Sequence, residues 1–195
     1  MTGGSRYLDK SPTMKKNLTI PSLGILLILL LAACVKDTDF EQADNITLRP
    51  TVELDLIYFD LSASDFFDSN TSNQILTVSD TTELRFLSDG EIQDGLKRAE
   101  FYFKFTNSIQ RSFTADFQFL SEQNDTTYAV QTSVSQGTIA NPVITEFIEN
   151  VEGNAIADLT MASKVVVSVT IPSSDANLTG SLNLKSKTTY YTEFQ

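Results

Sequence analysis

The clearest pattern along this chain is the alternation of apolar and polar residues with a period of two. Within 97–106, Ala99 and the phenylalanines at 101, 103 and 105 alternate with polar or charged residues, and 113–119 repeats this pattern. Successive side chains of a β-strand point to opposite faces, so each run predicts a strand with one buried face. A polar turn at 107–111 separates the runs. Together they predict a β-hairpin with an aromatic inner face.

Weaker strand signals occur throughout the rest of the chain. They cover residues 46–59, 74–79, 83–88, 126–134, 164–171 and 181–194. Only 141–161 breaks the rhythm, and 146–149 and 155–162 are candidates for short helices there. Seven or eight strands separated by turns predict an all-β fold, an antiparallel β-sandwich that is immunoglobulin-like in the broad sense, with one or two short helical segments around 142–162. A small barrel is the alternative.

An apolar segment near the start of the chain has the layout of a signal peptide. Lys15 and Lys16 precede the apolar run 23–31, and two alanines then lead to Cys34, the only cysteine in the sequence. The run is shorter than the roughly 20 residues that cross a membrane, which disfavours the alternative of a retained transmembrane helix. Residues 1–13 are polar and fit no signal peptide, so we expect a non-native extension there and a signal peptide at 14–33.

The four residues Leu31-Ala32-Ala33-Cys34 resemble the lipobox of bacterial lipoproteins. The resemblance implies acylation of the Cys34 thiol, cleavage between Ala33 and Cys34, and further acylation of the new N-terminus. Each buried CH₂ group contributes about 0.8 kcal/mol, so two or more acyl chains anchor a protein stably. We therefore expect the mature chain to be a membrane-anchored lipoprotein.

A short acidic segment, 34–45, separates this cysteine from the first β-like run. Its residues Lys36, Asp37 and Asp39 resemble the lipoprotein export signal of the Bacteroidota. The resemblance implies an outer membrane lipoprotein that faces the cell exterior. A solvated charged linker is the alternative. Residues 46–195 are then expected to form a single β-sandwich domain, a usual size for one domain.

The charge balance restricts the possible partners. From Cys34 onward the chain has 10 basic and 24 acidic residues, a net charge of −14. Such a chain repels phosphate backbones, so we expect no nucleic-acid partner. It also has no polybasic patch for anionic lipids, so membrane binding is expected through the lipid anchor. Because Cys34 is the sole cysteine, stability must come from packing rather than from disulfides.

The residue types present also limit the chemistry. The chain has no histidine, which excludes histidine-based hydrolases and histidine-ligated metal sites. Phosphate-binding glycine motifs are missing, so we expect no cofactor. Three carboxylates at Asp60, Asp65 and Asp68 could bind calcium, but a solvated loop in which Asp65 caps a helical turn through Phe66 and Phe67 is favoured. We expect no catalytic residues and no metal.

Two further sets of residues are candidate sites. Tyr58, Tyr102, Tyr190 and Tyr191 could stack on sugar rings if they share an exposed face, although such tyrosines are often packing residues. The segments 80–82 and 125–127, each Asp-Thr-Thr in a predicted turn, resemble the O-glycosylation sequon of the Bacteroidota. This resemblance implies glycan attachment at Thr81 and Thr126.

These observations predict a function without enzymatic activity. We expect a surface-exposed, lipid-anchored cell-envelope protein that serves as an interaction or accessory module, with an envelope protein or a glycan as its partner. A carbohydrate-binding surface module is one alternative, and a carboxylate-based glycoside hydrolase is another. A flat polar surface would favour the first function, an exposed aromatic row the second, and a cleft with two facing acids the third.

Overall fold

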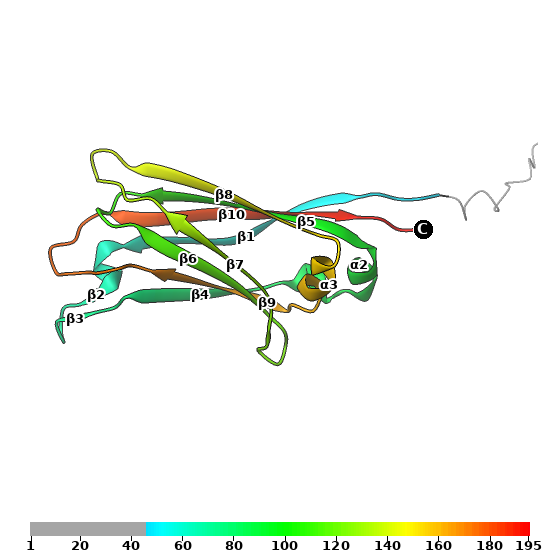
Figure 1. Ribbon diagram of the computed structural model, residues 1–195, viewed down its shortest axis with the longest axis horizontal. Helices are drawn as coiled ribbons and strands as arrows, with labels where there is room; N and C mark the ends of the chain where they lie inside the picture. The colour runs from blue at the N-terminus through cyan, green and yellow to red at the C-terminus, as the bar shows by residue number, and fades with distance from the viewer. Residues whose placement is uncertain (1–45) are drawn as a thin grey trace, which may run out of the picture. The chain divides into compact units, whose positions relative to one another are not determined.

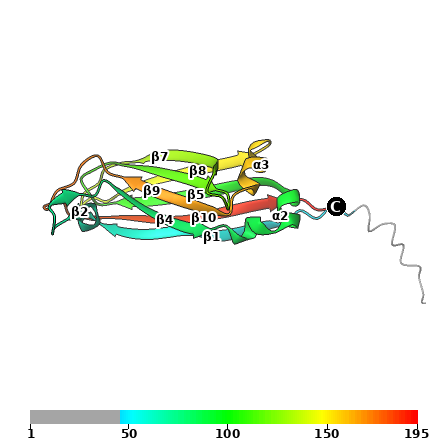
Figure 2. The same cartoon turned by 90° about the horizontal axis from the view of Figure 1, so that it is seen from below.

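The computed structural model describes residues 46–195, which form two four-stranded antiparallel sheets (Figures 1 and 2). The first sheet has the order β1 (Thr51–Ser62), β10 (Ser181–Thr192), β5 (Leu96–Asn107) and β8 (Val143–Glu152). The second has the order β4 (Thr77–Glu83), β9 (Lys164–Thr170), β6 (Phe113–Leu120) and β7 (Thr126–Val134). The minor elements are η2 (Ala63–Phe66), β2 (Phe67–Asp68), β3 (Asn73–Gln74), η3 (Arg85–Ser88), α2 (Gly90–Gly95) and α3 (Ala155–Thr160). The predicted antiparallel β-sandwich is confirmed.

The order of the strands is that of a jelly roll. Counting the long strands along the chain, the first sheet contains the first, eighth, third and sixth, and the second sheet contains the second, seventh, fourth and fifth. This is the eight-stranded arrangement of two Greek keys that defines a jelly roll. An immunoglobulin domain instead places strands A, B, E and D on strands C, F and G. The structure therefore gives the broadly predicted sandwich a definite connectivity.

The strands β5 and β6 do not form the predicted hairpin. β5 pairs with β10 and β8, whereas β6 pairs with β9 and β7, so the two strands belong to opposite sheets. The predicted inner faces are nevertheless buried, and Phe103 packs on Phe117 across the sandwich with ring centroids 3.9 Å apart. The pairing was wrong because a period of two identifies the buried face and carries no information about the neighbouring strand.

The connection between β5 and β6 is an arch whose interior is buried. The side-chain amide of Asn107 donates to the carbonyl oxygens of Arg111 (2.8 Å) and Ser135 (2.9 Å), and its oxygen accepts from the Ile109 N–H (2.8 Å). Gly137 lies against the arch so closely that a Cβ atom would sit 1.9 Å from the Asn107 carbonyl oxygen. This polar segment is therefore folded into the protein to carry the chain from one sheet to the other.

Replacing Asn107 with alanine is expected to lower the free energy of unfolding by about 2 to 4 kcal/mol. The change leaves buried backbone groups of the arch without a partner, and each such group costs about 1 to 3 kcal/mol. Urea unfolding measures the loss, with Gln110→Ala as the control because Gln110 is exposed in the same connection. Equal losses for the two variants would contradict the role given to Asn107.

Aromatic residues fill the space between the sheets. The large side chains with less than 2% exposure include Phe66, Phe101, Phe103, Phe105, Phe113, Phe117 and Phe119. Several of their rings contact one another, among them Phe101 and Phe119 at 4.9 Å and Phe66 and Phe113 at 5.3 Å between centroids. Tilted aromatic contacts at these distances are favourable beyond the area that they bury. The aromatic inner faces predicted from the sequence are therefore confirmed as part of the core.

Two local predictions need correction. The predicted strand 83–88 is wrong, because only Glu83 belongs to β4 and 85–88 form η3. The helical candidate 146–149 is also wrong, because it lies within β8, whereas the candidate 155–162 contains α3. The sequence of β8 does not show the alternation expected of a strand. Ile144 and Ile148 are exposed, whereas Glu149 is partly buried. Its apolar residues therefore do not mark one face.

Candidate functional site

The predicted lipoprotein residues are Ala33, Cys34, Lys36, Asp37 and Asp39, and they lie outside the described residues. Within 46–195 there is no helix long and apolar enough to cross a membrane.

Both ends of the described chain lie beside α2 (Figure 1). Leu48 pairs with Phe194, and the Glu193 N–H donates to the Gly95 carbonyl oxygen (2.8 Å). Arg49 lies 2.8 Å from the Glu193 carboxylate and holds the pKa of that group below its ordinary value. Any anchor that precedes residue 46 is therefore joined to the α2 end of the sandwich.

The predicted acidic loop lies at the other end, around η2 and β2 (Figure 1). The predicted helical turn through Phe66 and Phe67 is shifted, because it covers Ala63–Phe66, and Asp65 within it accepts from the Ser62 N–H (2.8 Å). Asp68 accepts from the hydroxyl of Thr71 (2.7 Å), which lowers the pKa of its carboxyl. No group of three potential metal ligands occurs in the part of the chain that the structure describes.

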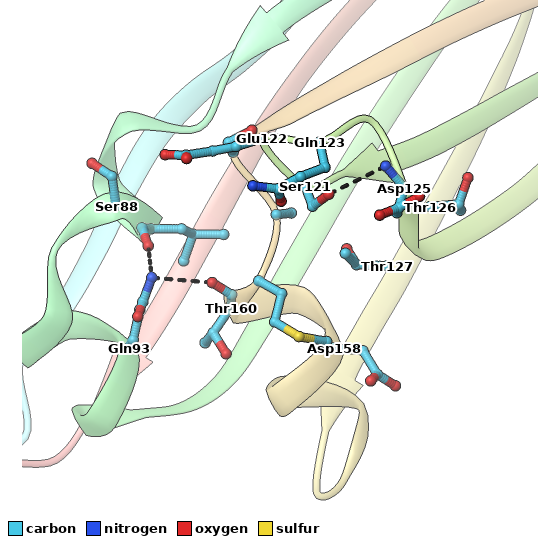
Figure 3. Close-up of a pocket in the computed structure, with 14 residues that line it drawn as sticks. Ser88, Gln93, Ser121, Glu122, Gln123, Asp125, Thr126, Thr127, Asp158 and Thr160 are labelled. Carbon is cyan, nitrogen blue, oxygen red and sulfur yellow. Dashed lines mark hydrogen bonds between the residues drawn. The ribbon is translucent and has the colours of Figure 1, made fainter.

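A polar cavity of about 700 Å³ lies at the α2 end, between η3, α3 and the turn that joins β6 to β7 (Figure 3). The side-chain amide of Gln93, which lines the cavity, donates to the carbonyl oxygens of Leu87 in η3 (2.7 Å) and Thr160 in α3 (3.1 Å). Its lining includes the carboxylates of Glu122, Asp125 and Asp158 and several hydroxyl groups. These groups could hydrogen-bond a polar ligand.

The two glycosylation candidates lie in different surroundings. Thr126 is exposed at the start of β7, directly after a turn, and lines the polar cavity (Figure 3). Thr81 is also exposed, but it lies in the middle of the edge strand β4 rather than in the predicted turn. The Asp80 carboxylate accepts from the Thr81 N–H (2.8 Å). Of the two threonines, only Thr126 therefore lies beside a turn, as the sequence predicted for both.

The four candidate tyrosines do not form a row. Tyr190 is only 2% exposed and stacks on Phe86 at 4.6 Å, so its prediction as an exposed-face residue was wrong; burial raises its pKa to about 12. The other three point outward from the first sheet. Tyr58 is 80% exposed, Tyr191 is covered by the Arg98 guanidinium at 3.9 Å, and Tyr102 is separated from Tyr58 by β10.

The first sheet carries an exposed apolar patch that was not predicted from the sequence. It consists of Tyr102 on β5 and Ile144 and Ile148 on the edge strand β8, and we call it the β8 patch. Ile148 lies directly opposite Tyr102, and the two isoleucines are 56% and 52% exposed. The Tyr102 hydroxyl donates to Glu146 (2.7 Å), which raises the pKa of the phenol. The patch is invisible in the sequence because it depends on the pairing of β5 with β8.

The second sheet presents a different outer face. Its outward side chains are small and mostly uncharged, and hydroxyl pairs link neighbouring strands, as between Thr77 and Thr170 (3.0 Å) and between Ser79 and Ser168 (2.8 Å). The one outward carboxylate of β6, Asp116, accepts from the Gln131 amide (2.6 Å). This face is polar, so the two faces of the sandwich differ in chemistry.

Comparisons with known proteins show similarity in solved structures alone, because no family model and no curated protein matches the chain. A protein from Parabacteroides distasonis has 12% identity and a TM-score of 0.44 over 58% of this chain. The VP2 subviral particle of infectious bursal disease virus has 8% identity and a TM-score of 0.44 over 73%. The enzymatically active domain of bacteriophage CBA120 tailspike protein 4 has 11% identity and a TM-score of 0.35 over 71%.

The chain spans less than two fifths of each of these three structures, with 37%, 32% and 18% of their respective lengths covered. The assignment of the jelly roll therefore rests on the strand order within residues 46–195.

Proposed function

We propose that this protein is a lipid-anchored, surface-exposed module of the cell envelope that binds a partner protein through the β8 patch and catalyses no reaction. The observation that carries the proposal is the exposure of Ile144 and Ile148 beside Tyr102 on an otherwise polar sheet face. The carboxylate of Glu146 lies between the two isoleucines on this face, so the β8 patch offers a partner two apolar contacts and one charged group. Fully burying an isoleucine contributes about 1.5 to 3 kcal/mol, and covering the exposed half of one of these side chains in an interface contributes about half of that.

The lipobox resemblance at Leu31–Cys34 supports the anchored part of the proposal. The segment 34–45 has 12 residues, which can span at most about 40 Å. It continues into the α2 end of the sandwich, where Leu48 pairs with Phe194. An acylated Cys34 would therefore tether the sandwich to the membrane through its α2 end.

The polar outer face of the second sheet and the scattered tyrosines favour this function over a sugar-binding module. A sugar ring stacks on an exposed aromatic surface, and Tyr191 is already covered by Arg98 while Tyr190 is buried. The remaining outward tyrosines, Tyr58 and Tyr102, have lysine side chains of β10 between them, at positions 185 and 187. An apolar contact with a protein uses the β8 patch without needing such a platform.

A photo-reactive phenylalanine analogue at position 148 is expected to crosslink one discrete partner in intact cells. The same analogue at position 131, which is exposed on β7 of the second sheet, serves as the matched control. Immunoblotting after irradiation should show a single shifted band for position 148 alone, and Ile144→Asp should abolish it. The same pattern of bands from both positions, or no shifted band at all, would overturn the proposal.

A further inference from the structure

At each side of the sandwich an edge strand of one sheet meets an edge strand of the other, and the contacts at the two sides differ. Where β7 meets β8, hydrogen bonds cross from one sheet to the other, from the Tyr128 hydroxyl to Glu149 and from the Ser135 N–H to the Thr145 hydroxyl (3.2 Å). Where β1 meets β4, no side-chain hydrogen bond joins these two strands within residues 46–195, and two cavities of about 230 and 190 Å³ lie there instead. We call this opening the β1–β4 groove.

The cavities follow one another along the groove. The smaller one lies between Phe59 and Leu61 of β1 and Val78 and Asp80 of β4. The larger is lined by Leu54, Leu56, Thr82, Leu84, Phe86, Thr188 and Tyr190, among others. From Val78 to Thr82 the chain advances four residues, which is about 13 Å in a strand. Each cavity is smaller than the 300 to 1,000 Å³ of a typical small-molecule site.

The larger cavity contains a polar group without a partner. Thr188 is 1% exposed, and its hydroxyl makes no hydrogen bond of normal geometry, although it lies near the Tyr190 hydroxyl. Burying a hydroxyl without a partner costs about 1 to 3 kcal/mol. The hydroxyl is enclosed, so a ligand that displaces part of the lining and brings a polar atom to it would remove the cost. The lining is otherwise mostly apolar, so the fitting group has an apolar body and a polar tip.

The rim of the groove offers backbone hydrogen bonds. β4 is an edge strand whose ladder pairs it with β9 alone, in a regular register over all seven residues. The N–H and C=O groups on its other side form a row that an added strand can use, although one of them, the Thr81 N–H, already donates to the Asp80 carboxylate. In such strand addition the main chain supplies affinity, and pockets for alternate side chains supply specificity.

The negative charge at the groove further restricts which peptides can bind. Asp80 pairs with buried Val167 and so faces the groove side of the sheet, although its carboxylate is exposed. It borders the smaller cavity of the groove, and its carboxylate has no salt-bridge partner among the described residues. A carboxylate on the inner side of an edge strand disfavours pairing with an apolar or acidic strand. It favours a strand that carries a lysine or an arginine.

We propose that the β1–β4 groove binds an extended peptide segment of a partner protein, which adds to the free edge of β4. Two side chains four residues apart enter the cavities, an aliphatic one beside Val78 and a tyrosine beside Thr188. A basic side chain between them faces Asp80. This site lies on a different edge from the β8 patch, so it goes beyond the function proposed above.

The test uses two capped heptapeptides, Thr-Leu-Thr-Lys-Thr-Tyr-Thr and the reverse order Thr-Tyr-Thr-Lys-Thr-Leu-Thr, because parallel and antiparallel addition place the tyrosine at opposite ends. The protein is the full chain purified in detergent. We expect calorimetry to detect binding of one order. Proline at both the central lysine and the threonine before it should abolish that binding, because one of these two backbone N–H groups faces β4 in either orientation. Hydrogen exchange should slow in β4 on binding and stay unchanged in β8. Binding of neither order, or equal binding of the proline peptide, would overturn the proposal.

Two variants test the named residues. Asp80→Lys should weaken binding of the lysine peptide at least tenfold and should favour a peptide with glutamate at that position, whereas Asp60→Lys, on the outward face of β1, should change neither affinity. Replacing the peptide tyrosine with phenylalanine should weaken binding about fivefold, and Thr188→Val should remove this preference. A preference that survives Thr188→Val would overturn the assignment of that cavity. Ile148→Asp should leave peptide binding intact, which separates this site from the β8 patch.

Discussion

Replacing Phe103 or Phe117 with alanine is expected to lower the free energy of unfolding by about 3 to 5 kcal/mol for each residue. Both side chains are fully buried, and their ring centroids lie 3.9 Å apart. Truncation removes the transfer free energy of the ring and leaves a cavity that the surrounding sheets can fill only in part. Because the two residues come from opposite sheets, each truncation also loosens the contact between the sheets.

Chemical denaturation of the two variants measures these losses. The neighbouring residues Tyr102 and Gln118 point outward, so their alanine variants serve as controls and should lose far less. The double variant should show a coupling of at least about 0.5 kcal/mol, as expected for residues in contact. Equal losses at inner and outer positions would contradict the alternation, and strictly additive losses would contradict the contact across the sandwich.

Cys34→Ala is expected to abolish acylation and to leave the precursor uncleaved. The lipobox resemblance implies that the peptidase acts after the thiol has been modified, so removal of the sulfur blocks both steps. Metabolic labelling with an alkyne fatty acid reports acylation, and the electrophoretic mobility of the chain reports cleavage. A Ser22→Ala variant within the signal region should be labelled and processed like the wild type. Labelling of the Cys34→Ala chain would contradict the lipoprotein hypothesis.

The sequence predicts strand faces much better than it predicts strand neighbours. Alternation in 97–106 and 113–119 correctly identified two buried aromatic faces, because the period of side chains in a strand is a local property. The pairing of β5 and β6 with strands of different sheets depends on the arch around Asn107, whose residues look like an ordinary polar turn. The jelly-roll order follows from such crossovers, which leave no periodic signal.

The candidate sites show the same difference between features that depend on local sequence and features that depend on strand pairing. Tyr190 and Tyr191 are adjacent in sequence, yet one is buried against Phe86 and the other is covered by Arg98. The β8 patch and the β1–β4 groove are each formed by strands that are separated in the sequence, so no short sequence motif predicts them. The resemblance of Leu31–Cys34 to a lipobox is the opposite case, because such a linear signal would be recognised before the chain folds.

Protease shaving of intact cells tests the central claim of a lipid-anchored protein on the cell surface most directly. The wild-type chain should be digested from outside, and the triple variant with alanine at Lys36, Asp37 and Asp39 should keep its acylation at Cys34 but become protected. These charges precede the first described residue, Ile46, so we expect their removal to leave the stability of the sandwich unchanged. Protection of the wild type would contradict surface exposure, and equal digestion of both chains would reduce the acidic segment to a solvated linker.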